Sequence, residues 1–308
     1  MDIVKKTVQD IKSLKIQGAS NVRKKAVDAL MKASTNSKLN NPLEFRKEFL
    51  TNSELLFYAR PTEPELRTAI RIFKKSIAQK DLTVKQMKEK LQKTDYDYEA
   101  SRKKAKELIV MHGAKLIPKN STILTICHSS TVVDILIKAK KNIKQVYCLE
   151  TRPLYQGRIT AKELSDAGLN VTLLVDNAAS TVLKKCDFFF SGADAILADG
   201  DVINKIGTNQ ISYACKRYDT KHYVCASTHK FEAVTFFGEQ EPIEQRAVKE
   251  IFEKKAKFSI LNPAFDRTDS STIEGIITEK GVFGPKQLAS ILYAELNLAS
   301  YESEFLKL

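Results

Sequence analysis

The first third of the chain has apolar residues at the spacing of amphipathic helices. They recur three or four positions apart from Ile3 to Leu14, and Ser20 can cap a second helix over residues 21–34. Further helical patterns cover residues 41–59, 61–77 and 83–112. Because no strand pattern interrupts them, residues 1–112 are predicted to form a helical N-terminal domain.

From about residue 113 the pattern changes to short apolar runs that alternate with helical ones. The runs are residues 121–127, 144–150, 170–176, 186–193, 221–227 and 257–261. Helical patterns over residues 131–141, 160–168 and 178–185 separate the first four. Such alternation is typical of a mostly parallel sheet with helices on both faces. The fold class is therefore predicted as α/β, with a Rossmann-like catalytic domain over residues 113–308.

Composition narrows the class of protein only a little. The 308 residues are 43% apolar and 28% charged, which is ordinary for a globular protein with a sizeable core. The net charge of +13 favours anionic partners such as nucleic acid, acidic surfaces or phosphorylated small molecules. The basic residues are mixed with glutamate in helical runs, and no zinc-finger or RNA-recognition pattern is present, so nucleic acid is the less favoured partner.

Cysteine use and hydropathy bear on the compartment. The five cysteines are an odd number without a C-x-x-C pair, which argues against a disulfide framework or a cysteine-rich zinc site and suits a reducing cytoplasm. The N-terminal stretch lacks the apolar core of a signal peptide, and no apolar run approaches the roughly 18 residues that cross a bilayer. We therefore expect a soluble, cytoplasmic protein without a membrane partner.

A thiol, Cys127, stands where the first predicted strand ends and a helix begins. Ligands of such sheets bind beyond the carboxyl ends of the strands, at helix N-termini. The positive end of the helix that begins near Ser129 favours the thiolate form of Cys127. The hydroxyls of Ser129, Ser130 and Thr131, with the first-turn amides, can hold a phosphate. The alternative is a buried cysteine followed by an ordinary N-cap.

A second candidate group is Asp194, which follows three phenylalanines and a Gly-Ala pair. A carboxyl at that apolar strand end is expected to retain its proton and to act as a general acid, whereas a capping or turn aspartate is the alternative. Asn204 and Lys205 precede a turn that begins another helix, so both can point into the same crevice. Asp199 and Asp201 are interpreted as plain turn residues.

Charged residues follow two further strands. Glu150 and Arg152 come after the strand predicted at 144–150, and Lys230 comes after the one predicted at 221–227. Each alone can be a surface charge on a connecting loop. Together, charged or nucleophilic side chains at four strand ends point to one site, because the carboxyl ends of parallel strands meet at one edge of the sheet.

Several mechanisms lack their sequence signature. The chain has no G-x-G-x-x-G after a strand, no G-x-x-x-x-G-K-[ST] loop and no G-x-S-x-G elbow. The side chains of Cys127 and His128 diverge as chain neighbours, which disfavours a Cys–His protease pair. The other histidines show no metal spacing, and His222, in an apolar strand, is interpreted as structural.

Five segments together resemble a known superfamily. They read ICHSS, ETRPLYQGR, GADAILADGDVINKIGTNQ, ASTHKF and NPAFDRTDSSTIEGIITEKGVFGP. The resemblance runs nearly end to end and implies a helical N-terminal domain before a Rossmann-like one. This superfamily holds methylthioribose-1-phosphate isomerase, ribose-1,5-bisphosphate isomerase and the alpha, beta and delta regulatory subunits of the initiation factor 2B nucleotide exchanger.

Two positions separate the branches of that superfamily. Regulatory subunits usually lack the cysteine and replace the aspartate, whereas this chain has Cys127 and Asp194. Methylthioribose-phosphate isomerases typically read Cys-Asn-Thr-Gly where this chain reads Cys-His-Ser-Ser. In these segments the chain resembles the archaeal ribose-1,5-bisphosphate isomerases. A methylthioribose-1-phosphate isomerase and a non-catalytic regulatory subunit remain the alternatives.

By this resemblance Cys127 is the proton acceptor and Asp194 the proton donor. The implied substrate contacts, with Arg152 as an added cation, are Gln17, Gly18, Ala19, Ser20, Arg60, Ser129, Ser130, Thr131, Arg152, Asn204, Lys205 and Lys230. The family commonly has arginine where this chain has Gln17, and a neutral amide loses a bidentate phosphate contact. Arg23, about one helical turn further on, can compensate for it.

The implied reaction converts ribose 1,5-bisphosphate to ribulose 1,5-bisphosphate in nucleoside and AMP salvage. A phosphate on C1 blocks ordinary opening to the aldehyde, so we expect acid-assisted ring opening and a phosphoenolate-like intermediate. No metal, nicotinamide or other cofactor is expected. The resemblance also implies a homo-oligomer, either a dimer or a hexamer built from dimers.

Overall fold

The structure is a computed structural model that describes residues 2–60, 62–254 and 257–296. The chain divides into two compact units, Met1–Lys104 and Ala105–Leu308. The division falls within the long helix α5 (Val84–Lys115). A domain boundary after residue 112, near the end of that helix, stays a prediction.

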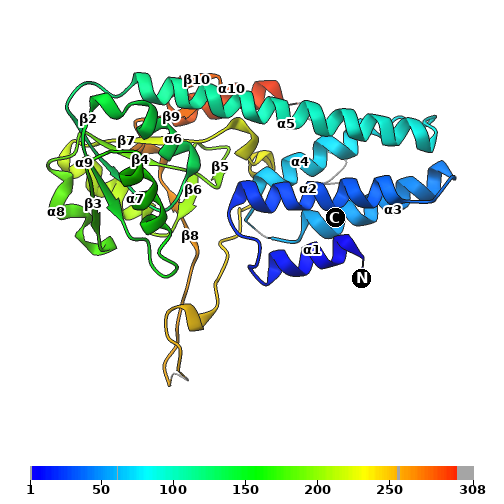
Figure 1. Ribbon diagram of the computed structural model, residues 1–308, viewed down its shortest axis with the longest axis horizontal. Coiled ribbons are helices and arrows are strands. Elements are labelled where there is room, and N and C mark those ends of the chain that lie inside the picture. Colours follow the sequence, from blue (N-terminus) through cyan, green and yellow to red (C-terminus); the bar gives the residue numbers. More distant parts are fainter. Residues whose placement is uncertain (1, 61, 255–256, 297–308) are drawn as a thin grey trace. The chain divides into compact units, whose positions relative to one another are not determined.

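The first unit is made of helices around an apolar core (Figure 1). Its complete helices are α1 (Ile3–Lys12), α2 (Ala19–Asn36), α3 (Pro42–Phe57) and α4 (Pro64–Ser76). Leu30, Phe49 and Phe73 lie in that core, contributed by three of the helices. The described residues of this unit contain no strand, as predicted.

Helix α2 begins earlier than its sequence pattern indicated. Its N-cap is Gly18, whose φ of 81° is readily adopted by glycine, and Ser20 lies in the first turn of the helix. The prediction that Ser20 caps the helix was therefore wrong. The Ser20 hydroxyl instead accepts a hydrogen bond from Arg102 at 3.3 Å.

The second unit contains a seven-stranded sheet in the order β10-β9-β7-β4-β1-β2-β3. All of its pairings are parallel except the one between β9 and β10. The strands are β1 (Ser121–Thr125), β2 (Ile143–Leu149), β3 (Val171–Leu174), β4 (Phe188–Ser191), β7 (Lys221–Cys225), β9 (Gly275–Thr278) and β10 (Gly281–Phe283). This mostly parallel sheet confirms the predicted α/β class.

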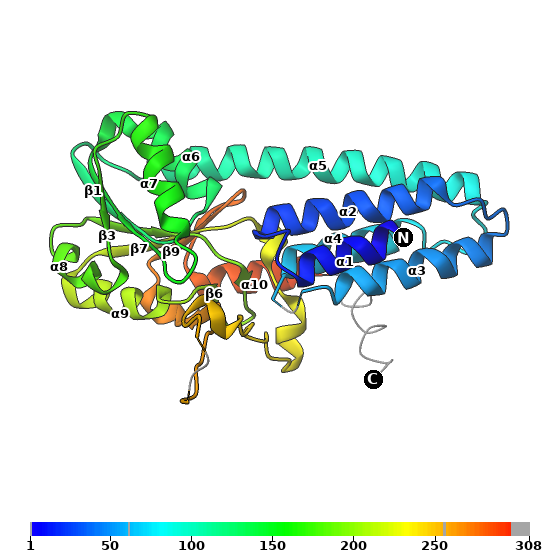
Figure 2. The ribbon, with the colours of Figure 1, turned by 60° about the horizontal axis from the view of Figure 1, so that its bottom comes forward.

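Helices cover both faces of this sheet (Figure 2). They are α6 (Ser130–Lys138), α7 (Gln156–Asp166), α8 (Ala179–Leu183), α9 (Thr208–Tyr218) and α10 (Pro285–Glu295). Side chains alternate between faces along a strand, so Ile123 packs with α6 and α7 while Leu124 packs with α8 and α9. Both faces are buried at the central strands β1 and β4, which explains why these strands read as apolar runs, whereas the edge strand β3 has no buried residue.

Shorter elements connect these layers. The 3₁₀ helices are η1 (Lys140–Asn142), η2 (Asp176–Ala178), η3 (Thr228–Lys230), η4 (Ala233–Phe237), η5 (Val248–Glu250) and η6 (Ser270–Thr272). A second, three-stranded antiparallel sheet has the order β5 (Ala195–Ile196), β6 (Val202–Lys205) and β8 (Phe265–Thr268). Asp199 and Asp201 lie in the turn between β5 and β6, as expected. The sequence patterns had indicated neither this sheet nor β9 and β10.

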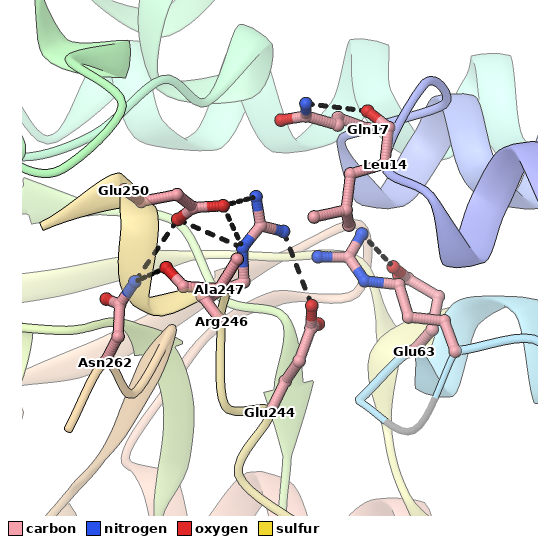
Figure 3. Close-up of polar contacts among 9 residues, drawn as sticks. Leu14, Gln17, Glu63, Glu244, Arg246, Ala247, Glu250 and Asn262 are labelled. Atoms are coloured by element: carbon pink, nitrogen blue, oxygen red, sulfur yellow. Dashed lines mark hydrogen bonds and ion pairs between the residues drawn. The ribbon is translucent and has the colours of Figure 1, made fainter. Parts of the chain in front are cut away.

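The predicted strand at residues 257–261 was wrong. These residues lie outside every strand, and Phe258 and Leu261 are 63% and 82% exposed. They belong to a segment between η4 and β8 that runs away from the sheet and returns (Figure 1). Arg246 ties this segment together through ion pairs with Glu244 and Glu250 (Figure 3). An apolar run without a neighbouring strand to pair with forms no ladder.

The strand order places a topological switch between β1 and β4. The chain moves outward from β1 to β2 and β3, then returns to the other side of β1 as β4. Connections on the two sides leave the strands toward opposite faces, which opens a crevice beyond their carboxyl ends. In the described residues no helix is long and apolar enough to cross a membrane.

Candidate active site

Cys127 lies two residues beyond the end of β1, next to the topological switch. Of the five cysteines, the other four are buried and Cys127 is partly exposed. Ser129 is the N-cap of α6, and its hydroxyl accepts the N–H of Val132 at 3.5 Å. The predicted strand-to-helix position of the thiol is therefore confirmed.

Asp194 lies beyond the end of β4, the neighbour of β1 at the switch. Its backbone N–H donates to the Ile203 carbonyl at 2.8 Å, which ties the end of β4 to β6. Asn204 and Lys205 are the last two residues of β6. The small antiparallel sheet thus carries two of the predicted site residues to the end of β4.

Charges from several strand ends act on the Cys127 thiol. Burial raises the pKa of this thiol, and the carboxylates of Asp194 and Asp176 raise it further. The Lys205 ammonium and a hydrogen bond from the His128 N–H lower it. Burial outweighs these lowering effects, so the pKa of the thiol lies above its usual value. The expected contribution of the helix end to the thiolate stays a prediction.

Ser129, Gly192 and Asn204 meet at the switch. A Cβ atom added at Gly192 would lie 3.1 Å from Ser129 Oγ and 3.9 Å from Asn204 Oδ1. The Asn204 amide donates to the Thr208 hydroxyl at 2.9 Å, which orients its oxygen. Glycine thus allows the end of β4 to approach the start of α6 closely, and a larger residue would require Ser129 to shift.

Two further predicted residues differ in their orientation. The Lys230 ammonium donates to the carbonyl oxygen of Ala193 at 2.5 Å, directly before Asp194 in the chain. The Arg152 guanidinium instead donates to the Tyr155 hydroxyl at 2.8 Å and lies over that ring. Lys230 thus reaches the candidate site, whereas the described contacts of the Arg152 side chain remain within its own exposed loop.

The predicted site residues of the helical unit lie at the start of α2 and after α3. Gln17 is exposed, and its side-chain amide donates to the Leu14 carbonyl at 2.8 Å (Figure 3). Gly18 and Ala19 begin α2 together with Ser20. Arg60 is buried and pairs with Glu63 at 3.3 Å.

Arg23 does not have the compensating position that its spacing from Gln17 suggested. It is 2% exposed and pairs with Glu65 and Glu99 inside the helical unit. A buried arginine that is paired in this way is held by its carboxylates. The idea that Arg23 replaces the usual arginine at position 17 was therefore wrong.

The sequence patterns missed four residues that organise the strand ends: Thr151, Thr160, Asp176 and Asp266. The Cys127 N–H donates to Thr151 Oγ1 at 2.8 Å, and Thr160 Oγ1 donates to the Cys127 carbonyl at 2.8 Å. Asp266 accepts the N–H groups of Gly207 and Asn209 at the start of α9. Thr151 and Asp266 lie in segments that carried the family resemblance, but only their contacts reveal what they do.

The histidine at position 222 has the structural setting that was expected of it. His222 is buried between Ser191, 2.9 Å from Nε2, and Ser212, 2.7 Å from Nδ1. Burial lowers its pKa to about 3, so it stays neutral. Within the described residues, no group of His, Cys, Asp and Glu could hold a metal ion.

The protein is thus an α/β protein with a Rossmann-like sheet, and a thiol, a carboxyl group and lysine side chains follow the strand ends around its switch point. The model of the initiation factor 2 subunit family matches residues 15–285. The chain therefore belongs to that family, as its motifs implied.

Relatives match the chain over most of its length. It is 37% identical to ribose 1,5-bisphosphate isomerase of Methanocaldococcus jannaschii, over 93% of each chain. It is 32% identical to ribose 1,5-bisphosphate isomerase of Archaeoglobus fulgidus, over 99% of this chain and 97% of the relative. These and further full-length isomerase relatives make the protein an isomerase within the family.

A solved structure gives the same result for the fold. Methylthioribose 1-phosphate isomerase of Pyrococcus horikoshii superposes with a TM-score of 0.79 at 28% identity, over 94% of this chain and 87% of that chain. The translation initiation factor eIF-2B of the same organism superposes with a TM-score of 0.78 at 25% identity, covering 92% and 98% of the two chains. Isomerases and translation factors thus share this fold, so the fold alone does not distinguish the two classes of protein and the residues of the site have to.

Proposed function

We propose that the protein converts ribose 1,5-bisphosphate to ribulose 1,5-bisphosphate, with Cys127 and Asp194 as its acid–base pair. The observation that supports this most is the placement of both residues beyond neighbouring strands at the switch point, close enough for the Asp194 charge to act on the thiol. The names of the relatives from Methanocaldococcus and Archaeoglobus support this substrate.

The pair can work with one shared proton. The negative charge of Asp194 opposes ionisation of the Cys127 thiol, so in this mechanism the thiolate acts while Asp194 carries the proton. Asp194 then gives its proton to the ring oxygen as the C4 oxygen leaves C1. The Cys127 thiolate takes the proton from C2, which leaves a phosphoenolate-like intermediate with a C1–C2 double bond.

The second half of the reaction restores both groups. Cys127 returns its proton to C1, and Asp194 accepts the proton of the C2 hydroxyl as the ketone forms. No proton is gained or lost over the cycle, and C1 keeps its phosphate. General acid–base groups of this kind each contribute about 10²–10⁴ in rate.

Cations around the strand ends suit a substrate with two phosphates. We assign substrate binding in the second unit to Ser129, Ser130, Thr131, Asn204, Lys205 and Lys230. The first turn of α6 offers backbone amides and hydroxyls, and Lys205 adds a positive charge near the thiol. The contributions of Gln17, Gly18, Ala19, Ser20, Arg60 and Arg152 remain predictions, as do the salvage pathway and a homo-oligomer.

Incubation with ribose 1,5-bisphosphate tests the proposal directly, with ribulose 1,5-bisphosphate detected by carbon and phosphorus NMR. We expect turnover by the natural protein, and a loss of at least about 100-fold in kcat for both Cys127→Ser and Asp194→Asn. Asp219→Asn is the matched control, because Asp219 is exposed and its φ of 56° suits asparagine. Undiminished turnover in both site variants would refute the assigned roles.

A parallel assay with 5-methylthioribose 1-phosphate separates the two isomerase candidates. A 5-phosphate requires cations around the far end of the sugar, whereas a thioether requires an apolar pocket. We expect kcat/KM to favour the bisphosphate. The regulatory-subunit alternative requires that neither sugar is converted.

A further inference from the structure

The backbone of Cys127 is held by a buried threonine from the next strand. The Cys127 N–H donates to Thr151 Oγ1 at 2.8 Å, and that hydroxyl donates in turn to the Leu149 carbonyl at 3.1 Å. Thr151 is 1% exposed and follows β2, the neighbour of β1. The Thr151 hydroxyl thus joins the ends of β1 and β2, because it accepts one hydrogen bond and donates another.

A carboxylate from a third strand holds Thr151 in turn. Asp176 Oδ1 accepts the Thr151 N–H at 2.7 Å, and Asp176 Oδ2 accepts the Arg152 N–H at 2.7 Å. Asp176 begins η2, two residues after β3 ends. Hydrogen bonds to an ionised acceptor are about twice as strong as neutral ones, so this contact fixes the loop after β2 firmly.

Both residues in the middle of this chain have unusual backbone conformations. Cys127 has a φ of 62° and Thr151 a φ of 64°. The left-handed region is unfavourable for an L-residue, and more so for a β-branched side chain such as threonine. Such conformations persist where surrounding contacts impose them, and they concentrate at functional sites.

We propose that Thr151 and Asp176 are positioning residues, which hold the Cys127 thiol in the orientation needed to take a proton from carbon. The inference rests on the proposed function of Cys127 as the base. Proton transfer from carbon requires the acceptor to lie in line with the C–H bond, and a displacement of about 1 Å can cost about 10²-fold in rate. The bonds from Asp176 through Thr151 to Cys127 prevent that displacement.

Asp176 has a second effect, which its charge produces. Its carboxylate opposes ionisation of the Cys127 thiol, in the same direction as burial and Asp194. The thiol therefore stays largely protonated before substrate binds. A change at Asp176 should consequently alter the ionisation of Cys127, while a neutral change at Thr151 should alter mainly its position.

The first experiment compares Thr151→Val, which removes the hydroxyl at nearly constant shape, with Thr151→Ser, which keeps it. We expect Thr151→Val to lower kcat about 10–100-fold with KM changed less than about threefold, and Thr151→Ser to restore kcat to within about threefold of the natural protein. Thr172→Val is the matched control, because Thr172 is exposed on β3 and its hydroxyl only accepts a bond from Gln145.

The second experiment needs no substrate. The rate at which iodoacetamide alkylates Cys127, followed over pH by mass spectrometry, reports the ionisation and access of the thiol. We expect Asp176→Asn to move the alkylation profile to lower pH, because the opposing charge is removed, and to lower kcat, because one backbone N–H loses its acceptor. A purely structural role for Asp176 would leave the profile of the folded protein unchanged.

Two results would overturn the inference. One is a Thr151→Val protein whose kcat equals that of Thr151→Ser. The other is an Asp176→Asn protein with the alkylation profile of the natural protein. Failure of the natural protein to convert ribose 1,5-bisphosphate would refute the proposed function separately, because the alkylation profile does not depend on it. If Thr151→Val does not fold, the kcat and the alkylation profile of Asp176→Asn still decide the question.

Discussion

Asp194 lies close enough to Cys127 for its carboxylate to oppose ionisation of the thiol, adding to the effect of burial on the thiol pKa. The two residues are 67 positions apart in the sequence and follow strands β1 and β4, which pair through Ile123 and Phe188. Removal of the Asp194 charge should therefore show in the ionisation of Cys127.

We first predict that Asp194→Asn lowers the pKa of the Cys127 thiol. Removing the negative charge makes the thiolate easier to form. Alkylation of Cys127 by iodoacetamide should therefore become faster at a given pH below that pKa. The other four cysteines are buried, and burial raises the pKa of each, so Cys127 should dominate the reaction. Asp219→Asn serves as the control, and an unchanged profile in Asp194→Asn would mean that the pair is not coupled.

Lys205 should have the opposite effect. Its ammonium lowers the pKa of the Cys127 thiol, so Lys205→Met should raise it and slow alkylation at the same pH. We also expect KM for the bisphosphate to rise at least about tenfold, because a cation is lost near a phosphorylated ligand. Lys216→Met, on the exposed side of α9, is the control. Faster alkylation in Lys205→Met would contradict the observed arrangement.

Because of Asp266, the free energy of unfolding should change with pH in the mildly acidic range. Burial raises its pKa from the ordinary aspartate range to about 6 in the folded protein. A raised pKa means that the folded state keeps the proton longer. The stabilisation from Asp266 is therefore fully present below about pH 4 and is lost as the pH rises through about 6, by about 3 kcal/mol.

Urea unfolding at several pH values from 4 to 7 measures this loss. Asp266→Asn does not titrate, so its free energy of unfolding should change less over that range than that of the natural protein. The amide oxygen can still accept from one of the N–H groups at the start of α9. Equal slopes in Asp266→Asn, Asp219→Asn and the natural protein would show that Asp266 ionises normally.

We expect a substitution at Arg23 to change the stability of the protein and a substitution at Gln17 to change substrate binding. Arg23→Met leaves the buried Glu65 with one cation fewer, so we expect about 3 kcal/mol less free energy of unfolding and an unchanged KM in the folded enzyme. A higher KM with normal stability in Arg23→Met would mean that Arg23 contacts the substrate.

Gln17 is exposed, and Gln17→Arg should lower KM without changing stability.

The sequence predicted the parts of the fold that depend on local pattern. Five of the six proposed strands and the helices between the first four are present, because the sheet packs between helices and its strands contribute apolar side chains to the clusters on both faces. The short strands of the second sheet were missed because Ala195 and Ile196 form a strand of only two residues. The apolar run at residues 257–261 was wrongly predicted as a strand because no strand among the described residues pairs with it.

From the sequence, the site could be predicted only for residues that were recognised because they follow neighbouring parallel strands. Cys127, Asp194 and Lys205 could be grouped because residues that follow parallel strands share one edge of the sheet. Thr151 and Asp176 could not be found in this way, since a threonine and an aspartate after strands are ordinary loop residues. Their importance lies in hydrogen bonds across three strands, which depend on packing rather than on sequence spacing.

Gly192→Ala should damage the site without unfolding the protein. The added methyl group would lie 3.1 Å from Ser129 Oγ and 3.2 Å from Ser129 Cβ, closer than side chains normally pack, so the start of α6 has to shift by a few tenths of an ångström. Because Ser129 caps α6 and is assigned to substrate binding, we expect kcat/KM to fall at least about tenfold. The backbone at Gly192 has no positive φ, so alanine itself is tolerated there.

Gly284→Ala is the matched control, because an added Cβ there meets nothing within 4 Å. This variant should keep normal kinetics with at most a modest loss of stability at the cap of α10. Equal kinetics in the two variants would mean that the space between the end of β4 and the start of α6 is not used by the substrate.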